Sequence, residues 1–180
     1  MVGISLKRVN GSIVQHDEGV VAMKDSMKKG LCFGLTSAII TTLGLMVGLH
    51  SFSGSELVII GGVLTIAIAD ACSDALGIHV SEEAEKIHTT KEIWESTITT
   101  FLAKFLFALT FIVPILVFDL ATAIMVSVVW GLCMLALLSY AIAKDEPGSA
   151  WKVIVEHLAI SLIVVVVIHS IGDWIAETYI

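Results

Sequence analysis

The stretch GGVLTIAIADACSDALGIH, residues 61–79, decides which class of protein this chain belongs to. It is apolar over nearly its whole length and is close to the ~20 residues that a helix needs to cross a bilayer. It also carries two aspartates, Asp70 and Asp74, four residues apart and therefore on one face of a helix. An ionised aspartate at mid-membrane costs at least about 2.5 kcal/mol, so another group must offset this cost.

The whole chain has the composition of a membrane protein. Of its 180 residues, 57% are hydrophobic and only 15% are charged, and long apolar runs are separated by short charged ones. We predict an all-α membrane protein with five transmembrane helices, because the strict alternation of a β-barrel is missing from the sequence. The predicted spans are residues 31–50, 57–79, 97–118, 120–143 and 153–175.

The basic residues predict the orientation of the five spans. All of them fall on one side of the membrane if the N-terminus is cytoplasmic and the C-terminus is outside. Lys104 lies about two turns into the third span, and its long side chain is expected to reach back to the cytoplasmic side. The ten residues are Lys7, Arg8, Lys24, Lys28, Lys29, Lys86, Lys91, Lys104, Lys144 and Lys152.

The sequence divides into a short N-terminal segment and a transmembrane domain. Residues 1–30 form a cytoplasmic N-terminal segment, in which residues 13–29 have the apolar spacing of a short amphipathic helix at the membrane interface. Residues 31–180 form the transmembrane domain, with a short acidic cytoplasmic connection at residues 80–96.

A stripe of small residues runs along the first span. Small side chains let helix backbones approach closely, either inside the bundle or in a symmetric contact between two copies. We expect a homodimer, although the sequence leaves both arrangements open. The stripe consists of Gly30, Gly34, Ser37, Thr41, Gly44 and Gly48.

Asp70 and Asp74 are the first candidates for an ion or proton pathway, the usual role of intramembrane carboxylates. The hydroxyl groups of Thr36, Ser37 and Thr41 in the first span are expected near the same depth, where they can assist. The alternatives are a protonated aspartate hydrogen-bonded to a neighbouring helix, or, for Asp74, a side chain that reaches the interface.

The connection after the second span is rich in possible metal ligands. Carboxylate and imidazole groups together suit Fe²⁺, Mn²⁺ or Zn²⁺, and Glu85 and His88 have the i,i+3 spacing of metal-binding helices. A solvated, acidic helix end is the alternative. The candidate ligands here are Glu82, Glu83, Glu85 and His88, and His79 is a candidate for the ion pathway.

Near the end of the fifth span, His169 and Asp173 are four residues apart. They are candidates for an exit site for the ion, and a simple hydrogen-bonded pair is the alternative.

The first two spans resemble those of the vacuolar iron transporter family. FGLTSAIITTLGLMVG, residues 33–48, resembles the pattern FGxxDGxxxTLGxxxG, and ADACSDALGIHVS, residues 69–81, resembles a run that ends in SMxxGEYxS. The resemblance implies a dimeric five-helix exporter that moves Fe²⁺ or Mn²⁺ out of the cytosol in exchange for protons. The chain has Ser37 where the family has Asp, and Asp74 and Ile78 where it has Met and Glu. Asp70 takes a position that is usually Gly.

These features predict a proton-coupled divalent metal transporter of the Fe²⁺ or Mn²⁺ type, with no tightly bound cofactor. Its expected partners are metal ions, protons, lipid and a second copy of the chain. The expected location is the plasma membrane in a prokaryote or a vacuole-like membrane in a eukaryote. A non-transporting membrane scaffold is the alternative.

Two other classes of function are disfavoured. Nucleic-acid binding is not expected, because the net charge is −7 and no basic stripe exists. An enzyme is not expected either, because an aspartyl mechanism needs two carboxylates facing each other across a site, whereas Asp70 and Asp74 share one helix.

Overall fold

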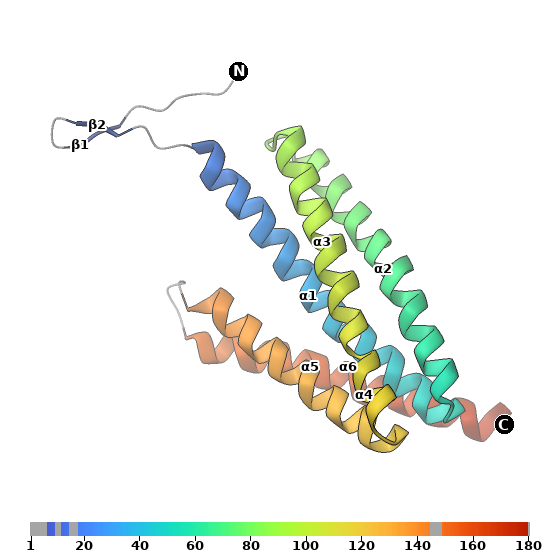
Figure 1. The fold of residues 1–180 in the computed structure, drawn as a ribbon. Coiled ribbons are helices and arrows are strands. Elements are labelled where there is room, and N and C mark those ends of the chain that lie inside the picture. Colours follow the sequence, from blue (N-terminus) through green and yellow to red (C-terminus); the bar gives the residue numbers. More distant parts are fainter. Residues whose placement is uncertain (1–6, 10–11, 15–17, 145–148, 180) are drawn as a thin grey trace.

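The computed structural model describes residues 7–9, 12–14, 18–144 and 149–179, with side chains described from residue 25 onward. A short hairpin of two antiparallel strands precedes a series of helices (Figure 1). The elements are β1 (Lys7–Val9), β2 (Ser12–Val14), α1 (Glu18–Ser53), α2 (Glu56–Glu85), α3 (Thr90–Thr110), α4 (Ile112–Val117), α5 (Leu120–Ala143) and α6 (Ala150–Tyr179).

Five helical segments are long and apolar enough to cross a membrane, which confirms the predicted number of spans. They cover Asp25–Ser53, Glu56–Glu85, Thr90–Val117, Leu120–Ala143 and Ala150–Tyr179. The protein therefore has the architecture of a multi-pass integral membrane protein.

The third span is interrupted by a turn at Phe111, between α3 and α4. Pro114 has no backbone N–H to donate to the carbonyl of Thr110, and its ring crowds the preceding turn. The sequence predicts a kink at this proline. The missing N–H and the ring of Pro114 explain the interruption three residues before it.

The acidic connection between the second and third spans is shorter than predicted, because residues 80–85 and 90–96 are helical. Only residues 86–89 lie between α2 and α3. α2 ends with Lys86 in the left-handed conformation, at φ 58°. α3 begins with a capping box, in which Thr89 accepts from the backbone N–H of Glu92 and the Glu92 carboxylate accepts from the backbone N–H of Thr89.

The predicted interfacial helix over residues 13–29 is not a separate element. Residues 12–14 form β2, residues 15–17 lie outside the described residues, and α1 begins at Glu18 and continues into the first span without a break. The charged part of this segment therefore extends the first spanning helix.

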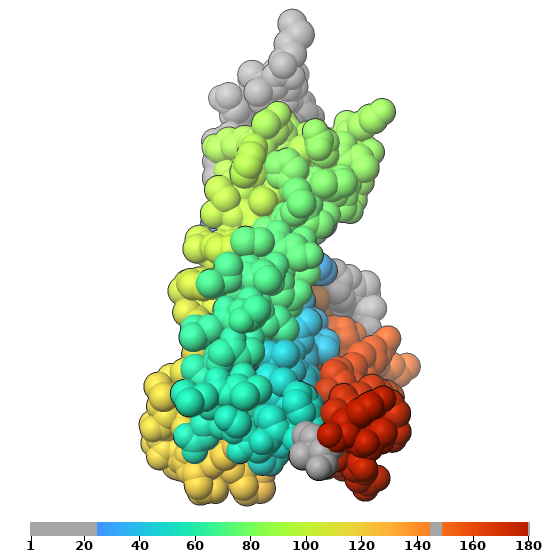
Figure 2. All heavy atoms as spheres, turned by 90° about the vertical axis from the view of Figure 1, so that its right-hand side faces the viewer, coloured from blue at the N-terminus to red at the C-terminus, as the bar shows by residue number. Residues whose placement is uncertain are grey.

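α1 is the central helix of the bundle. It packs against α2, α3, α5 and α6, and it is the most buried of the five spanning helices, whereas α6 is the least buried. α2 and α3 pack closely on each other, and so do α5 and α6. Figure 1 shows the α5–α6 pair diverging from α2 and α3 at the end where α1 begins. Figure 2 shows α2 along one face of the molecule, with α3 beside it.

We call the end of each helix that lies toward the start of α1 the basic end. The lysines at this end are Lys28, Lys29, Lys86, Lys91, Lys144 and Lys152. Of the lysines from residue 25 onward, Lys104 is the one that lies elsewhere, in the middle of the third span.

The core of the α1–α2–α3 group changes character along its length. From mid-membrane to the end opposite the basic end it is a continuous apolar cluster. Toward the basic end it contains buried polar and charged side chains, among them Glu82, Ser96, Thr100 and Lys104. The apolar part includes Leu43, Met46, Ile59, Val63, Phe107 and Phe111.

Candidate intramembrane cation site

Lys104 is the centre of a charged cluster in the middle of the membrane-spanning helices. Its ammonium group pairs with the carboxylates of Asp70 and Asp74, both from α2, and donates a hydrogen bond of 2.7 Å to the Ser37 hydroxyl from α1. Three helices thus contribute to one site. We call these four residues the central cluster.

The helix pattern explains how the central cluster is assembled. Asp70 and Asp74 are one turn apart on α2 and face the same neighbour. Asp70 is the fifteenth of 30 residues in α2, so it lies at the middle of that helix. Lys104 occupies the middle of the span formed by α3 and α4, so the depths of acid and base match.

The expectation that Lys104 reaches back to the cytoplasmic surface is wrong. Its side chain is only 2% exposed, against 27% for Asp70 and 19% for Asp74. Burying an ammonium group without a partner costs much free energy, and the two carboxylates at the same depth offset this cost without the side chain having to reach the membrane surface. The lysine therefore offsets the free-energy cost of placing two aspartates within the membrane.

A second charged cluster lies at the basic end. The fully buried carboxylate of Glu82, on α2, pairs with Lys29 from α1 at 3.2 Å and accepts a hydrogen bond of 2.6 Å from the Ser96 hydroxyl of α3. Lys29 also lies 3.9 Å from Glu85, which in turn contacts His88 at 3.0 Å. We call this group of five residues the inner cluster, and it again links α1, α2 and α3.

The predicted metal ligands are divided between these two clusters. Asp70 and Asp74 lie in the central cluster, Glu82, Glu85 and His88 lie in the inner cluster, and Glu83 is exposed on α2. Within the described part of the chain, no three His, Cys, Asp or Glu side chains converge as the ligands of one ion would. Lysine ammonium groups face the buried carboxylates instead.

Of the hydroxyl groups predicted beside the path, only that of Ser37 contacts the central cluster. Thr41 donates a hydrogen bond of 2.8 Å to the backbone carbonyl of Ser37, within its own helix. Thr36 is partly buried on α1, and its hydroxyl forms no hydrogen bond with Asp70 or Asp74.

Two histidines each bind a hydroxyl group on a neighbouring helix. His79 Nδ1 is 2.9 Å from the Thr97 hydroxyl, and His157 Nδ1 is 2.8 Å from the Ser139 hydroxyl. Each hydroxyl also lies within hydrogen-bond distance of a backbone carbonyl of its own helix. With the hydroxyl hydrogen directed to that carbonyl, the histidine is the donor through Nδ1; with the hydrogen directed to the ring, Nδ1 is the acceptor.

The predicted exit pair includes a partner that the sequence did not indicate. His169 Nδ1 lies 2.5 Å from the Ser51 hydroxyl of α1 and 3.4 Å from the Asp173 carboxylate. Serine, histidine and aspartate are the members of a hydrolase triad, but that mechanism needs the serine and the acid at different ring nitrogens. Here both approach Nδ1, so the contact joins α6 to α1 without the geometry of a triad.

The glycines of the small-residue stripe pack within the chain. A Cβ atom on Gly34 would lie 2.6 Å from the backbone oxygen of Thr100 in α3, and Cβ atoms on Gly44 and Gly48 would lie 2.8 and 2.7 Å from the side chain of Ile168 in α6. The stripe thus allows α1 to approach both α3 and α6.

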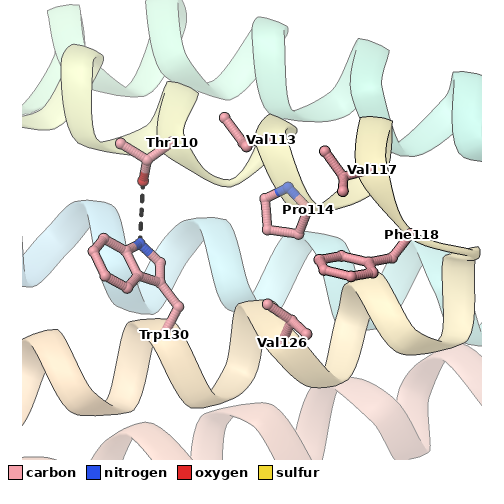
Figure 3. A pocket seen from close by; sticks show the side chains of 7 residues that line it. All are labelled: Thr110, Val113, Pro114, Val117, Phe118, Val126 and Trp130. Atoms are coloured by element: carbon pink, nitrogen blue, oxygen red, sulfur yellow. Dashed lines mark hydrogen bonds between the residues drawn. The ribbon is translucent and has the colours of Figure 1, made fainter.

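An apolar pocket of about 400 Å³ lies beside the interruption of the third span (Figure 3). The Trp130 indole N–H, from α5, donates a hydrogen bond of 3.3 Å to the Thr110 hydroxyl at its edge. The other lining residues are apolar: Val113, Pro114, Val117, Phe118 and Val126. The pocket contains no charged side chain and is separate from both charged clusters.

Sequence reasoning missed the basic partners of the acids, Lys29 and Lys104, and the buried hydroxyls Ser96 and Thr100. A signal for the α3 residues exists, because Ser96, Thr100 and Lys104 follow one another at intervals of four. Comparison of the chain with models of protein families and with curated proteins finds no match. The chemical interpretation of the site therefore depends on its geometry.

Proposed function

We propose that this protein is a proton-coupled transporter of divalent cations, of the Fe²⁺ or Mn²⁺ type, with the central cluster as its intramembrane binding site. One observation carries the proposal: two carboxylates and a hydroxyl converge on a single buried ammonium group at mid-membrane. Two ionised carboxylates and one ammonium group leave one negative charge in excess. Such a cluster attracts a further cation, and oxygen ligands suit Mn²⁺ and Fe²⁺.

In this proposal, Lys104 pairs its ammonium group with the two carboxylates when no metal ion is bound. Its ammonium group lies between Asp70 and Asp74, the position that a metal ion bound by both carboxylates would take. The ion can bind both acids only after the ammonium group has moved aside or lost its proton. Metal binding and the charge on Lys104 are thereby linked, which is the basis of coupling to protons.

The orientation follows from the basic end. Lysine-rich helix ends favour the cytoplasmic side, so export begins at the inner cluster and the C-terminus is outside. The acids of the inner cluster raise the local concentration of cations before they reach Asp74. A homodimer, and a plasma or vacuole-like membrane as the location, are proposed from the resemblance of the first two spans.

The test is a flux measurement with purified protein in liposomes. Mn²⁺ or Fe²⁺ uptake and the internal pH are recorded for the unchanged chain and for Asp70→Asn combined with Asp74→Asn. We expect metal flux with opposing proton movement in the unchanged chain, and its loss in the double variant. Glu56→Gln, an exposed acid on the same helix, is the control and should transport normally. Undiminished flux in the double variant contradicts the proposed site.

A second candidate is a non-transporting membrane scaffold, and one observation favours it. Each acid that faces the helix interior already pairs with a lysine, the partly buried Asp70 and Asp74 with Lys104 and the buried Glu82 with Lys29, which is sufficient for a purely structural role. A scaffold would show no metal flux and no metal-dependent change in thermal stability in detergent. A rise in melting temperature with Mn²⁺ that is lost in Asp74→Asn distinguishes the transporter from it.

A further inference from the structure

A buried face of α3 connects the inner cluster to the central cluster. Ser96, Thr100 and Lys104 are four residues apart on this face and are 0%, 0% and 1% exposed. Ser96 binds Glu82 and Lys104 binds Asp74. At 1.5 Å per residue, Thr100 lies about 6 Å along the helix from each of its two neighbours on this face.

The Thr100 hydroxyl has no hydrogen-bond partner among the described residues, although it is fully buried. The nearby Thr97 hydroxyl donates to the backbone carbonyl of Ile93 in the preceding turn, and the Ser96 hydroxyl, which donates to Glu82, lies 2.9 Å from the same carbonyl. Thr100 makes no such bond. A buried hydroxyl without a partner costs free energy and is rare in folded proteins, so this group is available to bind a ligand.

The helices around Thr100 supply apolar groups at the same level. On α2, Ile78 occupies the position midway between Asp74 and Glu82 on the acidic face, and it is buried. On α1, Gly34 packs directly against the backbone of Thr100. Of these three residues between the two charged clusters, one on each helix, Thr100 is therefore the one with a side-chain oxygen.

We infer that the Thr100 hydroxyl is an intermediate oxygen ligand for the transported divalent cation, on a path inside the α1–α2–α3 group from Glu82 to Asp74. This inference rests on the proposed function and adds to it the route and a residue on it. A hydroxyl suits a hard cation because it replaces one oxygen of the hydration shell. Being neutral, it binds weakly enough for the ion to move on, as conduction through successive sites requires.

The closing experiment compares initial rates of Mn²⁺ uptake into liposomes. Thr100→Val keeps the shape of the side chain and removes the hydroxyl, so we expect a loss of about tenfold or more, the order of one hydrogen bond to a charged group. Thr100→Ser keeps the hydroxyl and should stay within about threefold of the unchanged chain. Ser127→Ala is the control, because Ser127 on α5 is also buried and its hydroxyl has no described partner.

The outcomes separate the inference from the proposed function. A Thr100→Val protein that transports Mn²⁺ at the unchanged rate overturns the inference and leaves the proposed function standing. Absence of both Mn²⁺ and Fe²⁺ flux in the unchanged chain overturns both. Misfolding is detected by melting in detergent, where Thr100→Val should match or exceed the unchanged chain because an unpaired hydroxyl has been removed.

A second variant keeps the inference testable if Thr100→Val does not fold. Thr100→Cys is made in a chain in which Cys32, Cys72 and Cys133 are replaced by alanine, and a small cationic thiol reagent is applied. We expect the reagent to label the cysteine and Mn²⁺ to slow the labelling. Labelling that is independent of Mn²⁺, or complete protection without Mn²⁺, contradicts a path past this residue.

Discussion

The Lys104 ammonium group and the Ser37 hydroxyl are 2.7 Å apart, and this contact joins the middle of the third span to the middle of α1. Ser37 is a neutral group, so the lysine faces two acids, Asp70 and Asp74, and both are on α2. The ammonium group of Lys104 thereby joins α3 to α2 and to α1.

Removal of Lys104 alone should destabilise the protein more than removal of the lysine together with an acid. Lys104→Met leaves Asp70 and Asp74, one turn apart on α2, without a counter-ion. Breaking a fully buried pair in this way costs about 3–5 kcal/mol, and the cost here is smaller because the carboxylates are 27% and 19% exposed. Lys104→Met combined with Asp74→Asn should recover part of that loss. Melting temperatures in detergent for the two single variants and the double variant provide the measurement, and strictly additive effects would contradict the pairing.

Removal of Lys29 should destabilise the protein, whereas removal of the adjacent Lys28 should not. Both lysines are exposed, but Lys29 is the cationic partner of the fully buried Glu82 carboxylate, whereas Lys28 forms no salt bridge among the described residues. Lys29→Met therefore leaves an uncompensated buried charge, and Lys28→Met changes only the surface. The comparison uses thermal unfolding of both variants at neutral pH. Equal melting temperatures would show that Glu82 does not depend on Lys29.

Gly34→Ala should lower stability because it adds a methyl group where α1 touches α3. The new Cβ would lie 2.6 Å from the backbone oxygen of Thr100, which cannot move as a flexible side chain does. Gly61→Ala is the control, since a Cβ there meets no atom within 4 Å. The control should be neutral or gain up to about 1 kcal/mol from helix propensity. Thermal unfolding that ranks the two variants in the opposite order contradicts the packing.

The cap of α5 should make stability depend on pH in the acidic range. The backbone N–H of Thr122 donates to the Asp119 carboxylate, which lowers the pKa of this exposed group from its ordinary value. Because the pKa is lower in the folded state, the stabilisation is complete above the ordinary carboxyl pKa and is lost as the pH falls through the folded value.

Asp119→Ala should therefore melt at a lower temperature than the unchanged chain near neutral pH, and the difference should shrink toward about pH 3. Asp119→Asn retains an uncharged acceptor for the cap and should show a smaller pH dependence. Thermal scans of the three proteins across this range provide the test. A constant difference between Asp119→Ala and the unchanged chain would contradict a role for the ionised carboxylate.

The five spans could be predicted because each is a long apolar run bounded by charged or turn residues, and hydropathy alone detects such runs. The ends were less predictable, because residues 80–96 carry many charges and were interpreted as a connection. The pattern Thr89–Thr90–Lys91–Glu92 is a capping-box signature that locates the start of α3. The end of α2 at a left-handed lysine has no comparable signal, since glycine or asparagine is the usual residue there.

The partners of the buried acids could not be deduced from hydropathy. Positions along a span give the depth of Asp70, Asp74 and Lys104, but not which helices are neighbours or which faces meet. Once α2 and α3 are known to pack together, matched depth makes the pairing expected. The prediction that Lys104 reaches the membrane surface was wrong because water is not the only partner for its ammonium group. A carboxylate at the same depth in the membrane can replace it.

The glycine contacts between α1 and α3 distinguish this pair of helices from the contacts that α2 makes. Gly30 and Gly34 bring the two backbones so close that a Cβ on either glycine would meet the backbone of the other helix at 2.4 or 2.6 Å. A sliding or tilting motion between α1 and α3 would lose this fit along two turns. α2 is held differently: a Cβ on Gly61 or Gly77 would meet no atom within 4 Å, and one on Gly62 would meet the Leu49 side chain at 2.5 Å. α1 and α3 are thus joined through their backbones, whereas α2 is held to both helices through side chains, among them the lysines that pair with its acids.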